Sequence, residues 1–445
     1  MTSLMKWGTA TATLIAALVW HQPAFGQVTI AETGGWKLTT DGRVNSFISV
    51  DRGDGIPEGQ PDHVGTVTKD RTKDVAGNIR GTRIRNGFLT SILAFELTNQ
   101  VSPNLKVTAR VGLWMNISSG RTKNNGGPID PRELYGKIEG PWGSFLGGSH
   151  MALFGRGGIM TNYHVAHNYG LGYPCQIEDT SGGACGMSGF GAPFPGFEPG
   201  FVYTTPSLGG FELAVGIYDP ATVGQGQLNR APWPRAEAEA SFAFRDKLRL
   251  FASGFWQSLE GTISNPNEME RPTVPLIDIT STAQGAQAGL MATLGPIMFG
   301  GAAFAGQGMS AMMALDENPA TFSPARGTPR KSRGGFGMAA VKIDALRLKI
   351  AGGGGVVFLD KAPDDRLAVD ATGAVGNPQL LRRNIGYTVG VYQSTGPVHF
   401  ALEYFRADHT LHAFGMADVN DPTMIHLIAP RQVVNFVNAG MTVAW

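Results

Sequence analysis

The chain has 445 residues, of which 42% are hydrophobic and only 16% are charged. Its 36 basic and 35 acidic side chains nearly cancel, which argues against a polybasic surface for nucleic acid. A chain of this length can bury a large core without a disulfide scaffold, and its 62 glycines are about double the usual share. Few charges and much glycine together indicate a protein whose solvent is partly something other than water.

The N-terminal residues predict a bacterial secretory signal peptide. Lys6 precedes the apolar run 8–20, and Ala24 and Gly26 supply the small residues before a cut at Gln27. The run is too short to span about 30 Å of hydrocarbon as a helix, so a membrane anchor is the weaker alternative. We expect residues 1–26 to be removed and 27–445 to form one domain. No later stretch is apolar and long enough to predict a membrane-spanning helix.

Apolar and polar residues alternate with a period of two in the rest of the chain. The pattern is clearest over residues 105–118 and recurs over 36–50, 235–244 and 346–350. Because successive side chains of a strand point to opposite sides, each segment predicts a strand with one apolar and one polar face. Arg and Glu in mid-strand would not suit a dry core but suit a water-filled interior. Segment 88–98 fits less well, since Ile92 falls on the polar face, and a β-bulge would shift the register there.

Short and long connections also alternate along the chain. Turn residues predict tight turns at 102–104, 140–143, 206–210, 245–247, 295–296, 344–345 and 395–397. Long polar stretches lie near 51–79, 119–130, 151–200, 220–234, 259–280, 307–333, 360–381 and 410–430. Seven turns and eight long loops predict an all-β fold, a 16-stranded antiparallel transmembrane barrel with both chain ends on the short-turn side.

Aromatic residues lie near the expected strand ends, which is typical of the girdles of membrane barrels. They are Trp36, Trp142, Phe211, Tyr218, Trp256, Tyr404 and Trp445. The last of them ends the alternating segment 435–445 and resembles the C-terminal assembly signal of bacterial outer-membrane barrels.

Three segments resemble the general porins of Gram-negative bacteria, which are trimeric 16-stranded barrels. Residues 135–149 (YGKIEGPWGSFLGGS) resemble the strands entering the family's third loop, 201–211 (FVYTTPSLGGF) the strands leaving it, and 400–406 (FALEYFR) the penultimate strand. The resemblance implies an outer-membrane channel through which ions and small hydrophilic solutes diffuse passively. It also implies a homotrimer in outer-membrane lipid, assembled by the barrel-assembly machinery through its C-terminal strand, with no cofactor and no enzymatic activity.

In that family the third loop folds into the barrel and narrows the pore, and residues 151–200 occupy its position. Candidate acids for the constriction are Glu178, Asp179 and Glu198, and candidate bases on the opposite wall are Arg43, Arg110, Arg249 and Arg347. Opposed charges across a narrow aqueous gap would favour small polar solutes over apolar ones. Ordinary solvated charges are the alternative.

Two cysteines and several histidines lie in or near the same stretch. A local disulfide between Cys175 and Cys185 would stabilise it by about 2–3 kcal/mol in the chain-entropy model. A reactive thiol or metal ligand is the weaker alternative. His164 and His167, with His150 upstream, lack a third zinc ligand at a defined spacing, so we expect solvated or hydrogen-bonded histidines and no metal site.

Other motifs indicate no catalysis. Residues 352–355 are four glycines without the Gly-Lys-Ser/Thr of a phosphate loop, and in a strand they would permit close packing or bending. No Gly-x-Ser-x-Gly motif occurs. Three alternatives stay open. They are a channel selective for an anion, sugar or carboxylate, a barrel enzyme, and a secreted soluble β-protein. Saturable block by one solute would favour the first, an assembled nucleophile and base the second, and solubility without detergent the third.

Overall fold

The computed structural model describes residues 27–54, 78–87, 90–115, 129–165, 186–220, 228–264, 276–310, 322, 327–365, 380–417, 425–428 and 431–445. The expected signal peptide, residues 1–26, lies outside these ranges. Five of the residues singled out above also lie outside them: Cys175, Cys185, His167, Glu178 and Asp179.

Most of the described chain is β-strand. The strands are β1 (Val28–Thr33), β2 (Trp36–Gly53), β3 (Ile79–Arg85), β4 (Ser91–Ser102), β5 (Leu105–Met115), β6 (Ile129–Gly140), β7 (Gly143–Met151), β8 (Phe197–Thr204), β9 (Phe211–Tyr218), β10 (Arg235–Phe244), β11 (Leu248–Ser264), β12 (Leu276–Leu294), β13 (Ile297–Gln307), β14 (Lys331–Ile343), β15 (Leu348–Leu359), β16 (Leu381–Thr395), β17 (Val398–Leu411), β18 (Phe414–Ala417), β19 (Ile425–Ile428) and β20 (Arg431–Ala444). An α-helix, α1 (Arg156–Val165), follows β7, and short 3₁₀ turns η1 (Arg245–Lys247) and η2 (Asp344–Leu346) follow β10 and β14. No helix among the described residues is long and apolar enough to cross a membrane.

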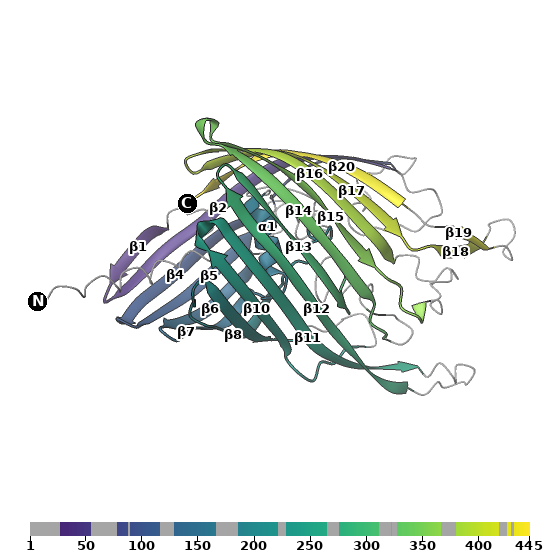
Figure 1. Ribbon diagram of the computed structural model, residues 1–445, viewed down its shortest axis with the longest axis horizontal. Helices are drawn as coiled ribbons and strands as arrows, with labels where there is room; N and C mark the ends of the chain where they lie inside the picture. The colour runs from purple at the N-terminus through teal and green to yellow at the C-terminus, as the bar shows by residue number, and fades with distance from the viewer. Residues whose placement is uncertain are drawn as a thin grey trace, which may run out of the picture.

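The strands close into a 16-stranded antiparallel barrel, which confirms the predicted fold class (Figure 1). Eighteen strands share the sheet, but two of its positions each hold two strands placed end to end. Along one edge of β2, β3 pairs with residues 47–53 and β4 with residues 36–43. Along the other edge, β20 pairs with residues 43–53 and β1 with residues 36–40. The first strand, β1, and the last strand, β20, therefore lie end to end along the same edge of β2. Their pairing with β2 closes the barrel.

All seven predicted tight turns are present and join consecutive strands at one end of the barrel, which we call the short-turn end. The prediction of a strand over 346–350 is wrong at its start. Leu346 belongs to η2, and Arg347 adopts the left-handed conformation with φ of 50° while its backbone N–H bonds to the Asp344 carbonyl. The chain needs this left-handed residue to reverse direction between β14 and β15, so the strand begins only at Leu348.

The alternation of side chains separates an apolar outer face from a mixed inner face. On β9, Leu213, Val215 and Ile217 point outward and are 38%, 44% and 51% exposed. On β10, the inward Glu237 and Glu239 are only 4% and 3% exposed. The predicted face patterns of residues 36–50, 105–115 and 235–244 are confirmed. Both faces follow from the period-two sequence pattern.

The break between β3 and β4 explains why segment 88–98 departs from that pattern. Arg85 on β3 points inward, is 1% exposed, and bonds to Ser49 and Asn438. Ile92 on β4 also points inward and packs against Trp114. Arg85 and Ile92 are an odd number of positions apart, so an unbroken alternation would have put them on opposite faces. The alternation is therefore shifted by one position between β3 and β4.

The aromatic residues near strand ends lie mostly on the outer face. Trp36, Trp142, Phe211, Trp256 and Tyr404 are between 37% and 46% exposed. The same prediction is wrong for Tyr218, which points inward, is 1% exposed and stacks beneath the guanidinium of Arg235 at 5.4 Å. The cause is the strict alternation of β9, which places even-numbered residues on the inner face.

Candidate functional site: the inner wall and the segment packed against it

The segment after β7 turns inward, and α1 packs against β11, β12, β13 and β14. Acidic and amide side chains of the inner wall fix its start. The backbone N–H of Phe154 donates to the Glu237 carboxylate at 2.8 Å, and the N–H of Gly158 donates to Oε1 of Gln287 at 3.1 Å. Arg156 forms an ion pair with Glu239 at 2.5 Å. The free N–H groups and positive dipole of a helix start favour such partners.

The other end of α1 meets a cation. Nζ of Lys349 donates to the His164 carbonyl at 3.4 Å and lies 5.0 Å from the centre of the Tyr392 ring. A lysine at a helix C-terminus complements the negative end of the dipole. In mid-helix, Nδ2 of Asn162 donates to Sδ of Met338 at 3.2 Å. The charges of β10 and β15 thus set the direction in which α1 lies on the wall.

The second described part of the segment, residues 186–200, returns along the same wall. The Phe190 ring lies 5.2 Å from the Phe405 ring, and Nδ2 of Asn384 donates to the Gly189 carbonyl at 3.1 Å. A Cβ at Gly355 would stand 2.0 Å from the Phe190 carbonyl oxygen. The prediction that the glycines at 352–355 permit close packing is confirmed at Gly355, because the backbone of the segment lies directly on it.

The wall formed by β2 and β4–β6 carries a cluster of charges around Arg110. The Arg110 guanidinium binds both carboxylate oxygens of Asp41, at 2.7 and 3.0 Å. It also lies 3.4 Å from Glu133 and 3.7 Å from Glu96. The four side chains are between 13% and 25% exposed. One cation and three partly exposed carboxylates therefore place an excess of negative charge at this point of the wall.

Beside that cluster, two arginines lie over the ring of Trp114. The Arg43 and Arg132 guanidinium groups lie 5.6 and 5.1 Å from its ring, and Phe197 packs edge-on at 5.2 Å. Arg132 is also paired with Asp130 at 2.6 Å. This group is absent from the sequence-based candidates apart from Arg43. A tryptophan at an even position of 105–118, on the polar face, was the signal that could have found it.

Only some of the residues predicted to form the constriction lie where they were expected. Arg43 and Arg110 lie on the inner wall as expected. Glu198 on β8 points inward, 3.8 Å from Arg235. Arg249 lies 3.9 Å from Glu239, the partner of Arg156, so it belongs to the side where α1 starts and not to the opposite wall.

Arg347 lies in the turn at the short-turn end and not on a strand. Glu178 and Asp179 lie outside the described residues, so an arrangement of acids opposite bases stays a prediction. The constriction candidates left out several acids that the structure places on the inner wall: Asp41, Glu96, Glu133, Glu237 and Glu239.

Two of the three histidines considered above are described. His150 on β7 points inward, and its Nδ1 lies 2.9 Å from the Gly148 carbonyl. His164 lies on α1, where burial lowers its pKa to about 4 and Lys349, Arg249 and Lys342 act in the same direction. Within the described ranges, no three acidic, histidine or cysteine side chains gather as metal ligands would.

The architecture is similar to that of several outer-membrane proteins. The outer membrane channel DcaP of Acinetobacter baumannii matches with a TM-score of 0.56 and 12% identity, over 93% of this chain and 99% of that one. The anion-selective porin of Comamonas acidovorans matches with a TM-score of 0.55 and 12% identity, over 92% and 100%. OmpT of Vibrio cholerae matches with a TM-score of 0.51 and 12% identity, over 93% and 99%. No family model and no curated protein matches the sequence. At this identity the likeness shows the fold, which is that of a 16-stranded porin barrel.

Proposed function

We propose that this protein is an outer-membrane porin through which ions and small hydrophilic solutes diffuse passively. The observation that carries the proposal is the charged cluster of Arg110, Asp41, Glu96 and Glu133, which stays partly exposed on the inner wall of a closed barrel. Ionised groups in that position need water, since an unsolvated buried charge would be very costly. A wall of this kind lines an aqueous path.

The outer face supports a position in a membrane. Apolar side chains such as Val215, Ile217, Val389 and Leu402 are between 44% and 54% exposed. Exposed apolar surface is unfavourable in water by about 25 cal/mol per Å², whereas hydrocarbon accepts it. A closed barrel also leaves no unpaired strand edge inside the bilayer. We place the short-turn end on the periplasmic side and the long connections outside the cell, as in other barrels of this architecture.

In this proposal, residues 151–200 narrow the path from one side. Support comes from α1 and Phe190, which pack on inner side chains of β11–β17 and leave the charged wall of β2 and β4–β6 facing them. Glu178 and Asp179 would add negative charge to the constriction, and a Cys175–Cys185 disulfide would tie the segment together. Lumen charges in such channels tune ion selectivity, while the width of the gap limits solute size.

We further propose a homotrimer whose protomers are assembled through the C-terminal strand. Trp445 exchanges two backbone hydrogen bonds of 3.0 Å with Gly42, so the last residue lies in the seam that closes the barrel. The assembly machinery would have to present this strand to β2 for closure.

Single-channel recording in a planar lipid bilayer tests the channel. We expect stepwise, long-lived openings, closing in groups of three, and a reversal potential in a KCl gradient whose sign reports the dominant wall charge. Pure protein that inserts and keeps its barrel circular dichroism spectrum, yet never conducts, would contradict the proposal.

The Arg43–Trp114–Arg132 stack supports a second candidate, a channel selective for aromatic carboxylates. Guanidinium groups bind carboxylates, and the Arg132 side chain stays 25% exposed beside the buried Trp114 ring, which orients it. Saturable block of the current by benzoate, weaker with acetate and lost in Trp114→Ala, would favour it. Equal effects of the two anions would leave general diffusion as the function.

A further inference from the structure

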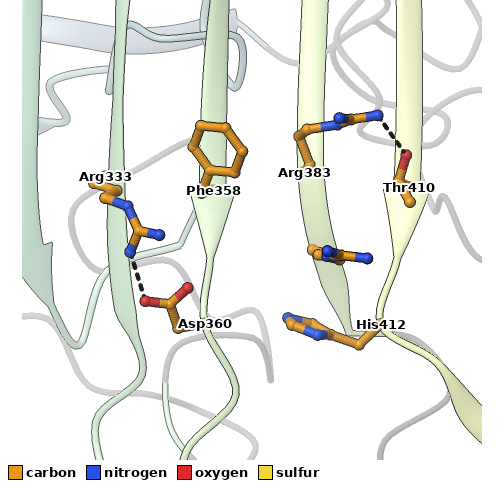
Figure 2. Close-up of a pocket in the computed structure, with 7 residues that line it drawn as sticks. Arg333, Phe358, Asp360, Arg383, Thr410 and His412 are labelled. Atoms are coloured by element: carbon orange, nitrogen blue, oxygen red, sulfur yellow. Dashed lines mark hydrogen bonds and ion pairs between the residues drawn. The ribbon is translucent and has the colours of Figure 1, made fainter.

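We propose that a pocket on the outer face of β14–β17 binds a phosphate monoester, presented by the headgroup of a surrounding lipid. The pocket lies at the end of the barrel opposite the short turns. It encloses about 340 Å³ and is lined by Arg333, Phe358, Asp360, Arg382, Arg383, Thr410 and His412. Figure 2 shows Arg333, Phe358 and Asp360 on one side of it and Arg383, Thr410 and His412 on the other.

Strand register places this pocket on the outer face. Arg333, Phe358, Arg383 and Thr410 are direct neighbours in one row across the four strands. The residue next to each of them in the chain points inward instead. These are Ser332, Val357, Asn384 and His409, which are between 0% and 7% exposed. The pocket thus opens away from the channel, so a ligand here would not occupy the solute path.

The charges of the pocket leave room for a dianion. Three guanidinium groups line it against one carboxylate, that of Asp360, which Arg333 already holds at 2.6 Å. The nearby Asp408 is bound by Nε of Arg431 at 3.0 Å. The lining residues therefore carry an excess of about two positive charges. A phosphate monoester has a charge of about −1.5 to −2 at pH 7, whereas a phosphodiester has only one negative charge.

Contacts within the pocket also leave arginine N–H donors available to a ligand. Nη2 of Arg383 reaches only a weak 3.5 Å contact with Oγ1 of Thr410. The Phe358 ring lies 5.6 Å from the guanidinium carbon of Arg333 and orients that group. Planar guanidinium forks match phosphate oxygens two at a time, which is why arginine suits this ligand.

The apolar surface beside the pocket points to a lipid as the source of the phosphate. On β16, the outer residues Tyr387, Val389 and Val391 continue from the pocket and are 54%, 49% and 39% exposed. A headgroup held by Arg382 and Arg383 would lay its acyl chains along these residues. Arg406, bonded to Asn435 on the same outer face, extends the basic surface toward β20.

Native mass spectrometry of the detergent-solubilised protein tests the site with defined probes. Phosphatidic acid, a monoester, is compared with phosphatidylglycerol, a diester, and inorganic phosphate is titrated separately by calorimetry. We expect retention of phosphatidic acid over phosphatidylglycerol. The double variant R382Q/R383Q should weaken this binding about tenfold or more, since one charge-assisted hydrogen bond is worth about that factor. R382K/R383K should restore part of it.

The matched control is R230Q, which removes an exposed arginine paired with Asp278 elsewhere on the barrel. It should bind phosphatidic acid like the wild type. If R382Q/R383Q weakens binding of inorganic phosphate and phosphatidic acid does not bind, the pocket is a phosphate site whose ligand is free phosphate and not a lipid headgroup. Equal binding by wild type and R382Q/R383Q, both folded by circular dichroism, would overturn the proposal. Channel conductance should be unchanged in every variant, so failure here is separable from failure of the channel function.

Discussion

At the scale of single residues, Arg110 decides the charge of its wall. It neutralises part of the charge of Asp41, Glu96 and Glu133, so Arg110→Gln leaves three carboxylates without their cation. We expect the reversal potential in a KCl gradient to shift toward K⁺ selectivity, and a loss of about 1–3 kcal/mol in unfolding free energy, because the removed partner is largely buried. Lys247→Gln, which removes an exposed charge in η1, should change neither. An unaltered reversal potential in Arg110→Gln would place the ion path elsewhere.

His164 gives the helix a dependence on pH. Its pKa of about 4 lies below the ordinary value near 6.5, so the packed helix binds fewer protons than the released one. Packing is unaffected above pH 6.5 and weakens as pH falls toward 4, by about 2 kcal/mol at pH 5. Hydrogen exchange of the α1 amides, corrected for the intrinsic pH effect, should therefore rise between pH 7 and 5. His164→Gln should flatten the profile and His399→Gln should not. An identical slope in His164→Gln would exclude this histidine.

At the scale of elements, Gly355 of β15 determines whether residues 186–192 lie on the wall. A Cβ at Gly355 would collide with the Phe190 carbonyl at 2.0 Å, whereas a Cβ at Gly337 on β14 would meet nothing within 4 Å. Gly355→Ala should displace the segment from its wall toward the charged wall, lower single-channel conductance and expose the 186–192 amides to exchange. Gly337→Ala should behave as wild type. If both variants conduct alike, the segment does not limit the current.

The elements themselves were largely predictable, because period-two alternation and turn residues act locally. Residues 105–115 and 235–244 show both faces directly in their sequence. Five of the seven turns carry Gly, Pro or Asn, and the turns at 245–247 and 344–345 carry Asp. Local rules failed where geometry interrupted the alternation. Arg347 was needed for a left-handed turn, and the break between β3 and β4 lets Arg85 point inward although it has the parity of the outer residues of β4. The short β1 went unrecognised because no periodicity marks it.

The candidate site was less predictable because its contacts join distant strands. Arg110 could be assigned to a polar face, but its partners come from β2, β4 and β6, which no local pattern connects. Likewise, Arg249 was placed opposite the inserted segment, whereas its neighbour Glu239 shows that it lies where α1 starts. Register around the ring, not composition, determines which charges meet.

At the scale of the whole molecule, the outer face predicts dependence on lipid. Val215→Arg places a charge in the middle of the outward row of β9, which should cost about 2–4 kcal/mol of folding free energy in vesicles if that row faces the bilayer centre. Leu208→Arg, in the turn before β9 and 71% exposed, should cost little. Equilibrium unfolding in urea from lipid vesicles measures both. Equal small losses would mean that this face is in water.

The pairing of β20 with β2 has a consequence for folding kinetics. Most neighbouring strands are consecutive in the chain and can pair as hairpins. In contrast, β2 must pair with β20 from the other end of the chain, where Arg43 lies opposite Ala444. Closing so large a loop loses more chain entropy than any hairpin, so ring closure is expected to be the slow step. Until then, two rows of unpaired N–H and C=O groups stay open and cannot enter hydrocarbon unsatisfied. Insertion and ring closure should therefore proceed as one coupled event.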